Sequence, residues 1–202
     1  MRSRPGSGTP CGRCFFLNVS AGIAIISEAS PIAQELTGVD VAAASILVSI
    51  ISVANGAGRF LWAWLSDAIG RKWVFLTMYL LQAALFFLLP LIGSTYFVLA
   101  VLAFIIASCY GGGFGTMPAF NADYFGSQNV GKIYGLMITA WGFGGVLGPL
   151  LISRVVDATG SYGRAFYIIA AIMLVSTILP LIVRPPKTPR EAEAGAPAEA
   201  RA

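Results

Sequence analysis

The sequence predicts an all-α integral membrane protein, and three observations lead to that fold class. Of its 202 residues, 57% are hydrophobic and only 11% are charged, whereas a typical soluble domain carries about 25% charged residues. The mean hydropathy is +0.79. Long intervals also contain no Asp, Glu, Lys or Arg, namely 41–58, 73–122, 133–153 and 165–183. Since a helix crosses a bilayer with about 20 apolar residues, these intervals are the expected membrane spans.

The charge-free intervals define the spans in order along the chain. We expect five full spans, at about 41–65, 73–92, 96–120, 132–153 and 164–183. The interval 73–122 is long enough for two helices, and Gly93-Ser94-Thr95 is typical of the turn between them.

The first apolar stretch, Phe15–Ile26, has only about half the length of a span. One interpretation is a signal anchor preceded by a basic segment. We favour the other, in which this stretch is the second half of a membrane helix that begins upstream. Residues 1–14 are then an unstructured or aberrant segment and 15–184 the membrane domain. Residues 185–202, which are rich in Pro, Ala and Glu, form a disordered cytoplasmic tail.

Enzyme and metal chemistry find little support in the sequence. The chain has no histidine, and Cys11 and Cys14 form a lone CxxC pair, whereas metal sites usually need a second pair of ligands. The spans contain no pair of acidic residues and no nucleophile with a base. We therefore expect no metal, no cofactor and no catalytic residues.

The basic residues predict the orientation in the membrane. If the turn 67–72 is cytoplasmic, ten basic residues lie on that side and only Arg154 and Arg164 on the other, as the positive-inside rule requires. The ten are Arg2, Arg4, Arg13, Arg71, Lys72, Lys132, Arg184, Lys187, Arg190 and Arg201. We expect a multi-pass protein of the cell (inner) membrane with a cytoplasmic carboxyl terminus. The net charge of +4 follows from this topology, so we expect no nucleic-acid partner.

Arg59 is the candidate binding residue. It shares one helical face with four polar residues at steps of three or four, namely Ser45, Ser49, Ser52 and Asn55. Arg59 precedes Asp67 by eight residues, which places it about 12 Å deeper and near the midplane. A charge at that depth costs about 2.5–3.5 kcal/mol, so it usually serves a function. We expect Arg59 and Asn55 to bind an anionic substrate, since a guanidinium can hold both oxygens of a carboxylate. The alternative is a structural arginine paired with backbone carbonyls or with another helix.

The turn after this span combines opposite charges in Asp67, Gly70, Arg71 and Lys72. A carboxylate is unfavourable at the negative end of a helix dipole, so Asp67 needs a positive partner. The candidates are Arg71, Lys72 and the amino-terminal end of the helix that begins near Gly131. We expect Asp67 to hold this side of the protein closed.

Aromatic residues and glycines mark the two later spans. Tyr134 and Trp141 are seven residues apart, so they share a helical face, and we expect them to line the binding cavity together with Tyr110. Glycines cluster at 111, 112, 113 and 115 in one span and at 142, 144, 145 and 148 in the other. Small residues let membrane helices approach closely, so we expect both clusters to serve helix packing.

The turn Asp67-Ala68-Ile69-Gly70-Arg71-Lys72 resembles the loop signature of the major facilitator superfamily, which lies between the eighth and ninth helices of that family. The family pattern has a glycine four residues before the Asp, whereas this chain has Ala63. Further segments across residues 15–184 resemble the oxalate/formate antiporter branch. They are Asn18–Gly22, Tyr110–Phe114, Pro118–Gly126, Tyr134–Leu136, Thr139–Gly142 and Gly144–Pro149.

This resemblance implies the carboxyl-terminal six-helix half of a twelve-helix transporter, with its first helix truncated and with two inverted three-helix repeats. It also implies transport of a small organic anion by alternating access. The oxalate-exchanging members place a lysine in the fifth helix of this half, but here Trp141 occupies that region. A single cation favours a monocarboxylate over oxalate. The alternative is a truncated, non-transporting membrane fragment, or a subunit that needs a separate amino-terminal half.

Overall fold

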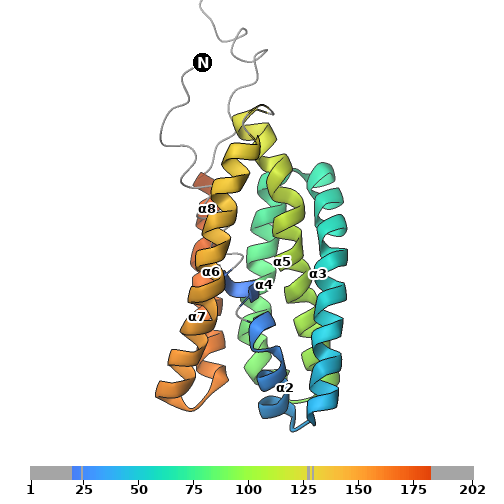
Figure 1. Cartoon of the computed structure of the whole chain (residues 1–202), viewed down its shortest axis with the longest axis vertical. Coiled ribbons are helices and arrows are strands. Elements are labelled where there is room, and N and C mark those ends of the chain that lie inside the picture. Colours follow the sequence, from blue (N-terminus) through green and yellow to red (C-terminus); the bar gives the residue numbers. More distant parts are fainter. Residues whose placement is uncertain (1–19, 24, 127, 129, 183–202) are drawn as a thin grey trace, which may run out of the picture.

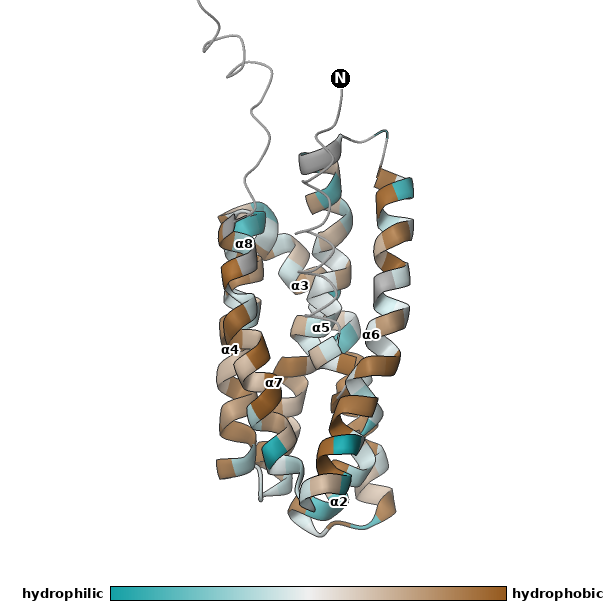
Figure 2. Cartoon of the chain, turned by 90° about the vertical axis from the view of Figure 1, so that its left-hand side faces the viewer, coloured by the Kyte–Doolittle hydropathy of each residue, from teal (hydrophilic) through white to brown (hydrophobic). Residues whose placement is uncertain are grey.

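The protein is a bundle of long helices that run along one common axis (Figure 1). The computed structural model describes residues 20–182 except 24, 127 and 129. The predicted terminal segments 1–14 and 185–202 lie outside these residues. The helices are α2 (Ala29–Thr37), α3 (Val41–Ile69), α4 (Arg71–Ile92), α5 (Tyr96–Phe125), α6 (Val130–Thr159), α7 (Tyr162–Ser176) and α8 (Ile178–Ile182). Hydrophobic residues predominate along the bundle (Figure 2).

Four helices, α3 to α6, are long and apolar enough to cross a membrane, with 22 to 30 residues each. They confirm the first four expected spans, and each continues beyond at least one predicted end. Gly70 alone joins α3 to α4, and its φ of 93° lies in the region that only glycine adopts easily. Of the charged turn 67–72, only Gly70 therefore lies outside the two helices.

The expectation of one continuous span at 164–183 is wrong. Its first part, α7, has only 15 residues, and Thr177 separates it from α8. The backbone N–H of Thr177 bonds back to Leu174, and the hydroxyls of Ser176 and Thr177 also donate to carbonyls of the preceding turn. Pro180 has no N–H to offer to the carbonyl of Ser176, so the regular helix ends there.

The first apolar stretch remains helical further than expected. Residues 20–27 apart from 24 are helical, and α2 continues to Thr37, where Gly38 ends the helix with a φ of 67°. Glu28 and Glu35 therefore belong to a helical segment. In Figure 1 its described part covers only the half of the bundle near the start of α3.

The packing of α3 against α5 depends on glycines. A Cβ at Gly58 would overlap the backbone of Ser108, and a Cβ at Gly111 or Gly115 would overlap the backbone of Asn55 or Arg59. The expected packing role of the α5 glycines is confirmed at these positions. At Gly142 on α6 a Cβ would meet no described atom within 4 Å, so the packing role of this glycine stays a prediction.

Candidate functional site

The polar stripe of α3 lies on one exposed face, as the spacing predicts. Ser45, Ser49 and Ser52 are exposed, and each hydroxyl donates to the carbonyl four residues earlier at 2.8 to 3.3 Å. Asn55 stands fourteen residues from either end of α3, and Arg59 follows one turn later, about 6 Å from the middle of the helix. Arg59 is exposed on this half of the bundle.

The guanidinium of Arg59 lies over an aromatic ring. Its Cζ is 5.4 Å from the centroid of Phe114 on α5. The centroid of the Phe114 ring is 5.3 Å from that of Tyr110 and 6.1 Å from that of Trp141 on α6, and both contacts are edge to face. Trp141 Nε1 donates to the hydroxyl of Tyr110 at 2.9 Å. We call Tyr110, Phe114 and Trp141 the aromatic wall; it joins α5 and α6 beside Arg59.

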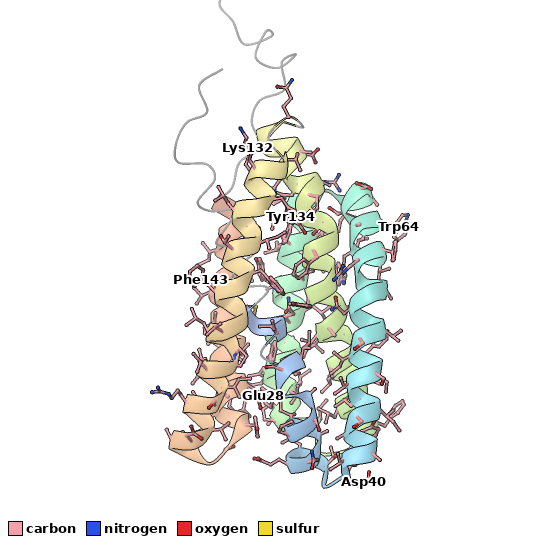
Figure 3. The ribbon with its side chains drawn as sticks, viewed as in Figure 1. Glu28, Asp40, Trp64, Lys132, Tyr134 and Phe143 are labelled. Atoms are coloured by element: carbon pink, nitrogen blue, oxygen red, sulfur yellow. The ribbon has the colours of Figure 1, made fainter. Side chains whose placement is uncertain are left out.

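Tyr134 belongs to the same neighbourhood. It is partly buried on α6, and Figure 3 places it toward the inside of the bundle, whereas Phe143 on the same helix points outward. Tyr134 and Tyr110 both lie within range of the charge of Arg59. The structure therefore brings Arg59, Tyr110, Tyr134 and Trp141 together from three helices.

Asn55 shares the face of Arg59, but its carboxamide lies partly between the helices. Its Oδ1 is buried and has no hydrogen-bond partner among the described residues. That oxygen lies against Gly111 of α5, at 2.7 Å from the place that a Cβ would take. Asn55 therefore contributes to the close contact of α3 with α5 as well as to the polar face.

Phe114 was missed by sequence reasoning. It follows Tyr110 by four residues, which is the spacing of neighbours on one helical face, and this signal could have found it. An apolar ring in an apolar helix carries no other mark, because most such rings contact lipid or neighbouring helices.

Arg59 has no acidic partner in the described part of the chain, where both ion pairs belong to Arg71. Of the alternative, a structural arginine paired with backbone carbonyls or with another helix, the described residues show the contact with the Phe114 ring of α5. A cation beside aromatic rings, with its N–H groups free of an acceptor among the described residues, is suited to bind an anion.

The charged end of the bundle is organised by Arg71. Its guanidinium pairs with Asp67 of α3 and with Asp123 of α5, the latter at 2.9 Å, and also donates to the hydroxyl of Ser66 at 3.0 Å. Arg71 was one of the expected partners of Asp67, whereas Asp123 was not foreseen. Lys72 forms no ion pair with a described residue. Arg71 thereby connects the ends of α3, α4 and α5.

A cavity of about 500 Å³ lies elsewhere, between residues 20–21, α6 and α7, with Arg154 at its edge. It includes none of the predicted site residues. Among the residues that the structure describes, no group of three or more His, Cys, Asp or Glu could hold a metal ion. The Arg59 neighbourhood is therefore the candidate site, and its chemistry is the binding of an anion.

Four helices of membrane length define a multi-pass membrane protein. The chain belongs to the major facilitator superfamily, because the family model "Major Facilitator Superfamily" matches residues 14–201. This is a family of transporters and not of enzymes.

Several relatives place the chain within this family. It is 34% identical to the MFS-type transporter YhjX of Escherichia coli (strain K12), over 65% of this chain and 33% of the relative. It is 28% identical to the oxalate:formate antiporter of Oxalobacter formigenes, over 86% of this chain and 42% of the relative. It is 33% identical to monocarboxylate transporter 14 of Mus musculus, over 69% of this chain and 27% of the relative. The chain thus spans less than half the length of these relatives.

A solved structure confirms the fold. The fucose:proton symporter FucP of E. coli superimposes with a TM-score of 0.72 and 19% sequence identity, over 89% of this chain and 43% of that chain. The described residues are therefore an all-helical part of the family fold.

Proposed function

We propose that this chain is the carboxyl-terminal half of a transporter that moves a small organic anion across a membrane by alternating access. The observation that carries the proposal is Arg59. Its guanidinium lies near the middle of a membrane helix, has no acidic partner among the described residues, and belongs to an exposed side chain. An anionic substrate would supply the missing partner.

The substrate that fits one cation is a monocarboxylate. A guanidinium binds both oxygens of one carboxylate through parallel hydrogen bonds. A second carboxylate, as in oxalate, would need a second cation, and the aromatic ring of Trp141 stands beside Tyr110 instead. The printed names of two relatives, an oxalate:formate antiporter and a monocarboxylate transporter, support a carboxylate substrate.

The exposed position of Arg59 supports a binding site that is completed by another half. Transporters of this kind bind substrate at the interface between repeats, near the midplane. The segments Asp67-Ala68-Ile69-Gly70 and Asp157-Ala158-Thr159-Gly160 are similar in sequence. They support inverted repeats, because they end α3 and α6 at opposite ends of the bundle (Figure 1). Gly70 and Gly160 both have a positive φ.

We propose that the protein lies in the cell (inner) membrane and that the end of the bundle with Asp67 faces the cytoplasm. Lys132 and Asp40 lie at opposite ends of the bundle (Figure 3), and Lys132 lies at the end where the positive-inside rule places most of the basic residues. A cysteine at exposed Ala68 should react with an impermeant maleimide only in opened cells, and one at exposed Ala42 also in intact cells. The reverse pattern would contradict this orientation.

The motif residues Asp67, Gly70, Arg71 and Lys72 are proposed to control closure of the cytoplasmic side. The support is the position of Arg71, whose ion pairs tie the ends of three helices together. A conformational change that separates these ends has to break those pairs.

A second function is that of a membrane fragment or subunit that does not transport without a separate amino-terminal half. The observation in its favour is that Arg59, the candidate binding residue, is exposed on the described part of the bundle. In that case six helices provide only one wall of the site.

Uptake into vesicles tests both functions. The chain would be reconstituted alone and together with a six-helix amino-terminal half, and labelled formate, acetate, pyruvate and oxalate would be offered. We expect saturable uptake of a monocarboxylate when both halves are present, with weaker uptake of oxalate. Uptake only with the second half shows that this chain supplies one wall of the binding site. Absence of uptake of all four anions by folded protein would contradict the transport proposal.

A further inference from the structure

We propose that Phe114 is a positioning residue for Arg59: its ring supports one face of the guanidinium and so directs the N–H edge toward the anion. This inference rests on the proposed function, in which Arg59 binds a carboxylate. It adds to the site a residue that does not itself bind the anion.

The side chain of Arg59 needs a support. A long cationic side chain in a membrane helix tends to extend along the helix until its charge reaches the polar interface. No described carboxylate holds Arg59 at its depth. The ring of Phe114 holds the guanidinium at this depth. The distance of 5.4 Å from Cζ of Arg59 to the ring centroid is within the range of about 6 Å in which a cation is attracted to an aromatic face.

The ring itself is held on two sides. Tyr110 lies one turn earlier on α5 and Trp141 approaches from α6, with interplanar angles of 66° and 82° to the Phe114 ring. The hydrogen bond of 2.9 Å between Trp141 and Tyr110 ties these two neighbours together. The Phe114 ring is therefore the central member of the aromatic wall.

The backbones of the two helices fix the register of the pair. Gly115 follows Phe114 directly, and a Cβ at that position would overlap the backbone of Arg59. This close approach of α5 to α3 brings the ring to the level of the guanidinium. Two separate features, the glycine contact and the aromatic contacts, thus place Phe114 under Arg59.

The consequence concerns how the anion is held. A guanidinium is planar, and a carboxylate binds in that plane along its N–H edge. A ring that occupies one face leaves the edge free and keeps water from the covered face. The aromatic face of residue 114, rather than its volume, should therefore determine the affinity for a carboxylate.

The experiment observes Arg59 directly in the full chain. Arginine labelled with ¹⁵N is incorporated into this chain, the Arg59 signals are assigned with the Arg59→Lys variant, and the purified chain, reconstituted in nanodiscs together with the amino-terminal half, is titrated with acetate. Phe114→Leu and Phe114→Met remove the ring, and Phe114→Tyr keeps it. Phe97→Leu is the matched control, since Phe97 lies on the same helix but is exposed at the other end of α5.

We expect the Arg59 signals to shift when the ring is removed, because the ring current is lost. The affinity for acetate should fall roughly two- to thirtyfold in Phe114→Leu and Phe114→Met, which corresponds to the strength of a cation–π contact. Phe114→Tyr and Phe97→Leu should remain close to the unmodified protein.

An acetate affinity that is unchanged in either folded variant without the ring would overturn the positioning role. Unshifted Arg59 signals in those variants would overturn the contact itself. If acetate, formate and pyruvate all leave the Arg59 signals of the unmodified chain unchanged, the proposed function fails, while the ring-current shift still decides whether Phe114 positions Arg59.

Discussion

Arg59 can stand near the middle of a membrane helix because its charge does not meet hydrocarbon on every side. A charge at that depth costs about 2.5–3.5 kcal/mol. The contact with the Phe114 ring returns about 0.5–2 kcal/mol of this cost. The rest of this cost is offset only when an anion or the surface of another half contacts Arg59. We assign Arg59 as a binding residue because of this uncompensated cost.

Trp141 determines at the residue scale how many carboxylates the site accepts. Trp141→Lys adds a second cation to the aromatic wall, next to Tyr110. We expect the affinity for oxalate relative to acetate to rise roughly tenfold or more, because a charge-assisted hydrogen bond contributes about 1.5–3 kcal/mol. The ratio would be measured by competition with labelled substrate in reconstituted vesicles.

Phe143→Lys is the matched control for this substitution. It lies on the same helix, but it is 69% exposed and points away from the bundle (Figure 3). It should leave the ratio of oxalate to acetate affinity unchanged. An equal ratio in Trp141→Lys and in the unmodified protein would contradict the selectivity that we assign to Trp141.

At the scale of elements, the crossing of α3 and α5 positions the site. Gly58 on α3 and Gly111 and Gly115 on α5 let the two backbones touch, and Arg59 and Phe114 lie next to these contacts. In a membrane, where lipid is as apolar as the side chains, such close packing is a main source of helix association. The position of the candidate site therefore depends on glycines, which have no side chain that could contact a ligand.

Two glycines of α3 should respond in opposite ways to alanine. Gly58→Ala inserts a methyl group into the backbone of Ser108, and we expect it to lower the free energy of unfolding by about 1–3 kcal/mol. Gly56→Ala meets nothing within 4 Å and should be neutral or stabilising by up to about 1 kcal/mol, since alanine favours the helix. Denaturant unfolding in detergent, followed by circular dichroism, measures both. Equal stability of the two variants would contradict the glycine crossing.

At the scale of the whole molecule, Arg71 joins three helix ends through exposed carboxylates. Arg71→Gln removes both ion pairs, and amide exchange near residues 64–70 and 119–125 should become roughly two- to tenfold faster, because exposed ion pairs contribute at most about 1 kcal/mol each. Exchange at residues 41–47, at the other end of α3, should not change.

Lys72→Gln is the control for Arg71→Gln, since it removes the same charge at the next residue without breaking a described ion pair. Hydrogen–deuterium exchange with mass spectrometry distinguishes the two variants. The same acceleration in both would show that net charge, and not the bridging position of Arg71, determines the order of this end.

Some features of the structure could be predicted from the sequence and others could not, for physical reasons. The spans 41–65 to 132–153 were predictable because the exclusion of charge over about 20 residues has few other causes. The interruption of the expected span 164–183 at Thr177 was not predictable, since Ser, Thr and Pro near a helix end change the backbone hydrogen bonds without changing the hydropathy. Arg59 was conspicuous as a lone charge in an apolar run. Phe114 and Asp123 were not, because their roles arise only from neighbours brought close by the fold.

The central claim is that Arg59 binds the transported anion, and uptake by its variants tests it most directly. The chain would be reconstituted in vesicles with an amino-terminal half, and saturable uptake of the preferred monocarboxylate would be compared for the unmodified protein, Arg59→Gln and Arg164→Gln. Arg164 is an exposed arginine on α7, so its replacement controls for the loss of one positive charge. The account predicts that Arg59→Gln abolishes uptake and that Arg164→Gln retains it. Uptake by Arg59→Gln with unchanged affinity would contradict the account.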